Sequence, residues 1–259
     1  MCKYSYWIMF YTLLRKEVTR VLRIWTQTLI PSAINISLYF LIFGTVVGKK
    51  IGLMNGVNYL NFITPGLLIM AVINNSYSNV VSSFFGSRFN RSIEEILVSP
   101  ITTHILIIGF ISGGIFRGLV VGCSVAIVAG VFGAYDILLL NIYLVLFGFF
   151  LCSILFSLGG LINGIFSRNF DDISIFPTFI LTPLIYLGGI FYSLDSLPLF
   201  WQKIVYFNPM FYIIELSRFS FLGSSSISPL KSFIIIITCI VTLYFFSYYL
   251  ISKGIRLKN

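Results

Sequence analysis

Few residues of this chain have types and spacings that suit chemistry on a substrate. Asp171 and Asp172 are adjacent carboxylates of the kind used in acid–base catalysis, but at the start of an apolar run they more simply cap a helix and favour its positive end. His104 is the only histidine, and neither it nor the four scattered cysteines have the neighbours that a metal site needs. We therefore expect no catalytic residues and no metal in this chain.

A nucleotide-binding loop is not expected either. Residues 44–50, GTVVGKK, superficially resemble a phosphate-binding loop, but they lack the four residues that the motif needs between its glycines. No serine or threonine follows the lysines, and no other segment supplies the motif. We therefore expect no cofactor in this chain, so that any ATP and magnesium would be bound by a separate partner chain.

The most informative polar residues lie together at residues 86–103, GSRFNRSIEEILVSPITT, between two apolar runs. Ser92 followed by Glu95 matches a capping box, which predicts that a helix begins at Ser92. Apolar residues then recur at helical spacing, and Pro100 disfavours helical backbone at the residue before it. The segment is therefore predicted to form an amphipathic helix of two turns that is suited to docking with another protein.

The composition indicates what holds this helix. The 259 residues are 58% apolar and only 10% charged, with a mean hydropathy of +0.99, which is typical of polytopic membrane proteins. The net charge of +9 does not indicate nucleic-acid binding, because the basic residues are dispersed and no nucleic-acid motif is present. The expected fold is an all-α integral membrane protein.

The apolar runs set the expected organisation of a single transmembrane domain over residues 1–259. Residues 7–23 have an apolar face and basic residues elsewhere, which predicts an interfacial helix in contact with membrane lipid. Most basic residues fall on one side if both termini are cytoplasmic, and this also places residues 86–103 in the cytoplasm. The six predicted transmembrane helices are residues 25–47, 62–85, 104–133, 137–166, 173–191 and 232–251.

Residues 192–230, between the last two spans, are too apolar for an ordinary loop. Proline and an Asn-Pro pair interrupt them, which predicts two short helices separated by a reversal, as in an outer re-entrant hairpin. Glu215 and Arg218 are one turn apart and are expected to pair, which favours a local structural role over contact with substrate. The residues assigned to this hairpin are Pro198, Trp201, Asn208, Pro209, Glu215 and Arg218.

The third predicted span combines small residues with one charge. Small residues spaced by four favour close helix packing over a substrate groove. Arg117 is costly at this depth, so it is expected either to line a transport pathway or to extend toward the cytoplasm. The small residues are Gly114, Gly118, Gly122, Ala126 and Gly130.

Two of these segments carry a resemblance to a known family. Residues 91–100, RSIEEILVSP, resemble the inner loop of ABC-2 type transporter permeases, and the hairpin residues occur in that family's order. The resemblance extends over nearly the whole chain and is closest to the YadH-like and the NodJ- and daunorubicin-exporter-like permeases. It implies the transmembrane permease subunit of an ATP-driven exporter in the bacterial inner membrane.

The resemblance also implies the partners. Such a permease dimerises, here as a homodimer, and sits on two copies of a separately encoded ABC ATPase. Its inner-loop helix would act as the coupling helix, inserting into the ATPase beside the N-terminal interfacial helix. The residues assigned to coupling are Arg91, Ser92, Ile93, Glu94, Glu95, Leu97 and Pro100.

The cargo implied is an amphiphilic drug, a lipid or a lipid-linked glycan, moved between the two permease subunits. The polar residues of the spans are candidates to line that pathway, although interhelical hydrogen bonding explains them equally well. They are Asn35, Asn74, Asn75, Tyr77, Arg117, Thr178 and Thr182.

Two alternative functions fit the sequence less well. An ion-coupled secondary transporter should show internal repeats and ionisable residues at mid-membrane, and an intramembrane enzyme needs a nucleophile, a metal set or a carboxylate pair in one cavity.

Overall fold

The computed structural model describes residues 3–54, 56–133 and 141–256. Nearly all of these residues are helical, which confirms the predicted all-α membrane fold. In chain order the elements are α1 (Lys3–Arg23), α2 (Trp25–Tyr39), the π-helix η1 (Phe40–Val47), α3 (Gly48–Ile51), β1 (Leu53–Met54), β2 (Val57–Asn58), α4 (Tyr59–Phe89), α5 (Ser92–Val98), α6 (Thr103–Val131), α8 (Ile142–Phe166), α9 (Phe170–Phe176), the π-helix η2 (Pro177–Leu181), α10 (Thr182–Leu187), the 3-10 helix η3 (Leu194–Ser196), α11 (Leu199–Val205), α12 (Pro209–Leu222) and α13 (Pro229–Ser252).

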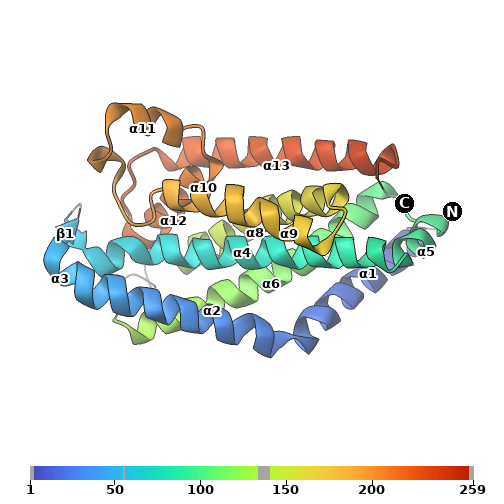
Figure 1. Cartoon of the computed structure of the whole chain (residues 1–259), viewed down its shortest axis with the longest axis horizontal. Coiled ribbons are helices and arrows are strands. Elements are labelled where there is room, and N and C mark those ends of the chain that lie inside the picture. Colours follow the sequence, from blue (N-terminus) through green and yellow to red (C-terminus); the bar gives the residue numbers. More distant parts are fainter. Residues whose placement is uncertain (1–2, 55, 134–140, 257–259) are drawn as a thin grey trace.

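Helix α4 runs through the centre of the molecule and packs against α6 and α8 (Figure 1). Helix α2 lies along one side of this bundle, and α9, α10 and α13 lie along the other. The central helices are buried accordingly. Of an apolar stretch of 18 residues in each helix, 56% is buried inside the protein for α6 and 67% for α8. For the first and fifth predicted spans the shares are only 12% and 11%, so these two are peripheral.

Five helical stretches of the described residues are long and apolar enough to cross a membrane. They are Trp25–Ile51, Thr103–Val131, Ile142–Phe166, Phe170–Leu187 and Pro229–Ser252. Helix α4 covers the remaining predicted span, residues 62–85, and its 31 residues exceed the ~20 needed for a crossing. It carries more polar side chains than the other long helices, and many of them are packed inside the protein. The count of six spans stays a prediction.

Several helix ends differ from the expected ones. The first apolar helix continues past residue 47 to Ile51. The fifth ends at Leu187 instead of residue 191, because the chain turns at Gly189, whose φ of +83° favours glycine. The start expected for the fourth span, residue 137, lies outside the described residues, and α8 begins at Ile142.

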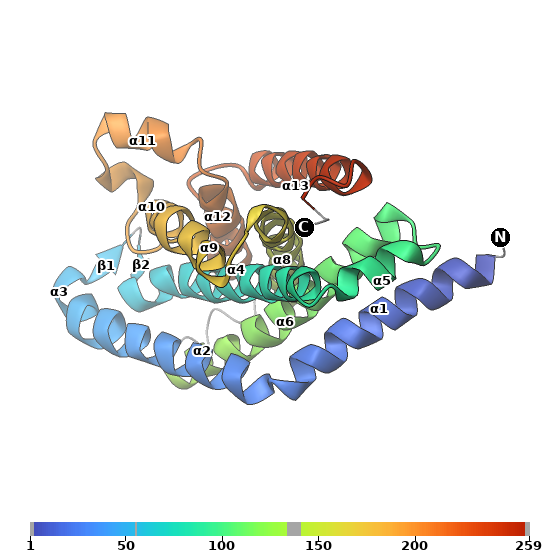
Figure 2. The same ribbon diagram turned by 45° about the vertical axis from the view of Figure 1, so that its right-hand side comes forward.

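The two ends of the molecule are different. Helix α5 and both ends of the chain lie at one end, whereas α3, the β1–β2 pair and α11 lie at the other (Figure 1). The two short strands pair antiparallel, with Leu53 opposite Asn58. The turned view keeps this separation, with α11 and α5 at opposite ends (Figure 2). The predicted docking helix and the N-terminal helix therefore occupy one end together.

The small residues of α6 allow the bundle to pack closely. A Cβ added at Gly118 would meet the hydroxyls of Ser76 on α4 and Ser153 on α8. One added at Gly114 would lie 2.6 Å from Val80 Cγ2 on α4. The stripe therefore faces other helices, which supports the packing interpretation over a substrate groove.

Candidate functional site

Helix α5 runs from Ser92 to Val98, the extent that the sequence predicts. Ile93 is its buried anchor and packs in the apolar cluster around Phe84 on α4 and Phe110 on α6. Leu97 and Val98 face outward and are 40% and 88% exposed. The helix is therefore held on one side and presents apolar side chains on the other.

The start of α5 is made differently from the predicted capping box, and that part of the prediction is wrong. Arg91 precedes the helix in the left-handed conformation, with φ of 58°, and its carbonyl accepts from the Glu94 amide at 3.0 Å. The hydroxyl of Ser92 donates to the Ser87 carbonyl at 3.2 Å, and the helix start has no capping hydrogen bond from a side chain. Because α4 continues to Phe89, a tight turn leads into α5 and its backbone replaces the cap.

A groove of about 530 Å³ separates α5 from α1. Lys16 lies on its α1 wall and the exposed Glu95 on its α5 wall, and apolar side chains form most of the remainder. This mixture of apolar and oppositely charged groups is suited to a segment of another protein. The lining residues are Ile8, Met9, Thr12, Leu13, Lys16, Ser92, Glu95, Ile96, Ser99 and Ile101.

A buried polar cluster, which the sequence analysis missed, joins α1 to the central bundle. Ser83 on α4 donates a 2.7 Å hydrogen bond to Glu17, whose side chain is 1% exposed. Arg20 pairs with the same carboxylate at 3.1 Å and donates to the Asn79 carbonyl at 2.9 Å. A Cβ at Gly113 on α6 would lie 2.8 Å from Glu17 Cβ, so a glycine is needed there. The available signal was a single acidic residue three positions before Arg20 in an otherwise basic helix.

Three of the seven pathway candidates lie together. Asn35, Asn74 and Asn75 line a groove of about 250 Å³ between α2 and α4, which Tyr39 also lines. The amide of Asn75 donates to the Ser32 hydroxyl at 3.1 Å, so this side chain makes the interhelical hydrogen bond that was the alternative to a pathway role. Asn35 is exposed, and Asn74 is half-buried.

The other four candidates lie elsewhere. Tyr77 lines a separate, mostly apolar cavity of about 490 Å³ between α4, α8, α10, α12 and α13. Arg117 is half-buried on α6, and its positive charge is repelled by that of Arg20. Thr178 is exposed on η2, and Thr182 donates to the carbonyl one helical turn before it. The structure therefore does not gather all seven residues into one site.

The segment predicted as an outer hairpin contains the two expected short helices, α11 and α12. Pro198 immediately precedes α11, on which Trp201 is exposed. Asn208 caps α12 by accepting from the Met210 amide at 3.0 Å, and Pro209 is the first residue of that helix. The sequence thus specifies this reversal locally.

Glu215 and Arg218 form the predicted ion pair, with 2.6 Å between Oε1 and Nη1. Both side chains are buried. Arg218 also donates to the Gly189 carbonyl, and Glu215 accepts from the Ser226 amide at 2.6 Å. The pair therefore connects α12 to the chain on both sides of it, which is the structural role expected for it.

Nearby, Tyr192 closes the turn after α10. Its hydroxyl donates to the Leu187 carbonyl at 2.8 Å. Burial raises the pKa of this phenol, and the charge of Arg218 opposes the rise. The hydroxyl therefore remains a neutral donor at physiological pH.

The residues first considered for chemistry have structural partners. His104 Nδ1 lies 2.6 Å from the hydroxyl of Tyr244 on α13. Asp172 accepts from the Arg168 amide at 2.8 Å, which is the helix-capping role expected for it. Arg88, which was not among the residues assigned to coupling, donates to the carbonyls of Gly164 and Ile165 at the end of α8.

These features define a class: a multi-span α-helical membrane protein with a short helix at one end that exposes apolar side chains. The chain belongs to the ABC-2 type transporter family, which it matches over residues 9–222, and this confirms the resemblance. It is 45% identical to the inner membrane transport permease YadH of Escherichia coli K12 over 254 residues, 98% of each chain. It is therefore a multi-pass inner membrane transport permease.

More distant relatives share part of the length. Nodulation protein J of Rhizobium leguminosarum bv. viciae is 24% identical over 187 residues, which cover 72% of this chain and 71% of the relative. Nodulation protein J of Sinorhizobium fredii is 25% identical over 186 residues, which cover 70% and 68%.

Proposed function

We propose that this chain is the permease subunit of an ABC exporter and that a separate ATPase subunit drives it. The exporter moves an amphiphilic drug, lipid or lipid-linked glycan across the inner membrane. Both termini and α5 lie in the cytoplasm, where the ATPase binds. ATP hydrolysis in the partner displaces α5, and the attached spans then alternate access to the pathway.

The observation that carries this proposal is the exposed apolar side of α5. Leu97 and Val98 project from a helix that Ile93 fixes to the bundle, so a force on α5 reaches α4 and α6 directly. The groove between α1 and α5 adds a second surface for the same partner. Permeases of this family work with ABC ATPase subunits, and this chain has no phosphate-binding loop of its own.

The permease acts as a homodimer, with one ATPase for each subunit. The uneven burial of the apolar helices in the single chain supports the homodimer. The apolar helices Trp25–Ile51 and Phe170–Leu187 are the least buried of the five in the single chain, and they meet where the Tyr39 and Tyr186 hydroxyls lie 3.3 Å apart. Tyr39 also lines the groove that contains Asn35, Asn74 and Asn75. A second copy against this face would cover exposed apolar surface and place the polar groove beside the interface.

Affinity purification from membranes tests this division of labour. Tagged full-length chain, extracted in mild detergent, is expected to bring down an ABC ATPase in equal copies. The same chain stripped of its partner is expected to hydrolyse no ATP. ATP hydrolysis by the isolated chain, or cargo movement driven by an ion gradient without any ATPase, would contradict the proposal.

A further inference from the structure

Helix α1 has three faces, whereas its sequence predicts only an apolar face and a basic one. The face that packs on α6 carries Leu13, Glu17 and Val21, all of them buried. A second face is apolar and uncovered: Trp7 and Tyr11 are 68% and 53% exposed. Aromatic side chains of this kind are enriched where a protein meets the interface of a membrane. Helix α1 therefore has a surface for lipid in addition to its contact with the bundle.

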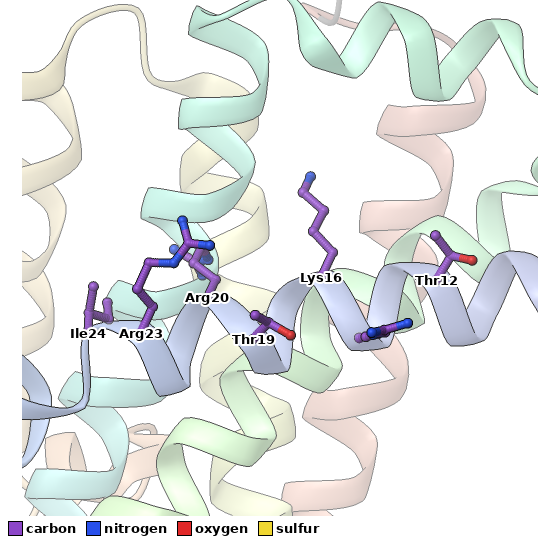
Figure 3. Close-up of a pocket in the computed structure, with 7 residues that line it drawn as sticks. Thr12, Lys16, Thr19, Arg20, Arg23 and Ile24 are labelled. Atoms are coloured by element: carbon purple, nitrogen blue, oxygen red, sulfur yellow. The ribbon is translucent and has the colours of Figure 1, made fainter.

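The third face of α1 is basic and lines a groove of about 510 Å³ near the bend into α2. Figure 3 shows Lys16, Arg20 and Arg23 projecting from this stretch of the helix. Thr12 and Thr19 also line the groove, and the Thr12 hydroxyl donates to the Ile8 carbonyl at 2.8 Å. The groove thus combines cations with the hydroxyl of Thr19.

Most of this positive charge is uncompensated. Arg20 is occupied by Glu17 and Asn79, but Arg15, Lys16 and Arg23 are exposed and form no ion pair with any residue in the described ranges. A ligand that neutralises them must be anionic. Arginine side chains bind phosphate oxygens in a bidentate manner, which makes a phosphate group the best match for two arginines and a lysine.

We infer that this groove binds the phosphate headgroup of an anionic glycerophospholipid. The adjacent Trp7 and Tyr11 face decides for a lipid over a soluble anion, because it offers apolar surface where acyl chains would lie. The arginines contact the phosphate, and the Thr19 hydroxyl donates to a further headgroup oxygen. This inference does not depend on the ATPase, since a permease with any energy source would have the same groove.

Lipid retention by the purified full-length chain tests the inference. The detergent-solubilised chain is incubated with phosphatidylglycerol or phosphatidylcholine, and bound lipid is counted by native mass spectrometry, with and without excess inorganic phosphate. The test variant is Arg15→Gln/Lys16→Gln/Arg23→Gln. The matched control, Lys49→Gln/Lys50→Gln/Lys203→Gln, removes the same charge from exposed positions elsewhere.

The wild type and the control are expected to retain roughly tenfold more phosphatidylglycerol than phosphatidylcholine, and the test variant is expected to lose this preference. Equal retention by wild type and test variant would overturn the inference, as would an equal loss in the control. Full displacement of lipid by inorganic phosphate would also overturn it and identify a soluble anion as the ligand.

A second measurement needs no change to the cations. Trp25 follows the groove directly, and it becomes the only tryptophan in Trp7→Phe/Trp201→Phe. Brominated phosphatidylglycerol is expected to quench its fluorescence more strongly than brominated phosphatidylcholine. Equal quenching by the two lipids would contradict a headgroup-specific site.

Discussion

Ser83 on the central helix α4 donates a 2.7 Å hydrogen bond to Glu17 on the N-terminal helix α1. This contact crosses between two helices far apart in the sequence, and Arg20 completes it with an ion pair to the same carboxylate. Because α1 also forms one wall of the groove beside α5, the contact ties the proposed docking end to the centre of the bundle.

Replacing Glu17 with leucine is expected to destabilise the protein. The change leaves Ser83 and Arg20 without their shared acceptor, at a cost of about 1.5–3 kcal/mol in the free energy of unfolding. Unfolding in mixed micelles measures this. Glu94→Leu is the control, since Glu94 is exposed and the expected change there is within about 0.5 kcal/mol. Equal effects of the two substitutions would show that the Glu17 cluster contributes no stability.

The Glu215–Arg218 pair is expected to show strong coupling. Arg218→Met leaves a buried carboxylate without its ion-pair partner and should cost about 3–5 kcal/mol. In a double-mutant cycle with Glu215→Leu, the unfolding free energies should reveal a coupling of about 1–3 kcal/mol. Additive single effects would mean that the two side chains act independently.

A leucine at position 118 is expected to disrupt the bundle. Gly118 faces the serine side chains of α4 and α8, so the larger side chain forces these helices apart. The amount of folded protein in the membrane should fall severalfold. Gly148→Leu on α8 is the matched control, because no atom lies within 4 Å of a Cβ added there. If both variants accumulate equally, the stripe does not set the packing distance.

The sequence predicts features that depend on neighbours along the chain. The Glu215–Arg218 pair follows from its spacing, and the reversal at Asn208 follows from the chemistry of an Asn-Pro cap. The end of helix α5 was placed correctly from Pro100, and its start at Ser92 agrees with the prediction although the capping box that indicated it does not form. These signals are local, so no knowledge of the packing was needed.

Features that depend on contacts across the fold were not predictable in this way. Nothing in the sequence near Glu17 indicates that Ser83 will reach it, so this contact between α1 and α4 was not predicted. The capping box at Ser92 failed because the turn at Arg91 satisfies the helix start with backbone groups. The seven pathway candidates were grouped by polarity alone, and only three of them share a groove.

The outer side of α5 is the surface that we propose binds an ABC ATPase. The most direct test compares the ATPase recovered with wild-type chain and with Leu97→Asp/Val98→Asp, whose changed side chains are exposed. A matched control, Leu199→Asp/Phe200→Asp, alters two exposed apolar residues on α11 at the opposite end. We predict that ATPase recovery falls roughly tenfold for the α5 variant and is unchanged for the α11 control. Undiminished recovery with the α5 variant would contradict the account.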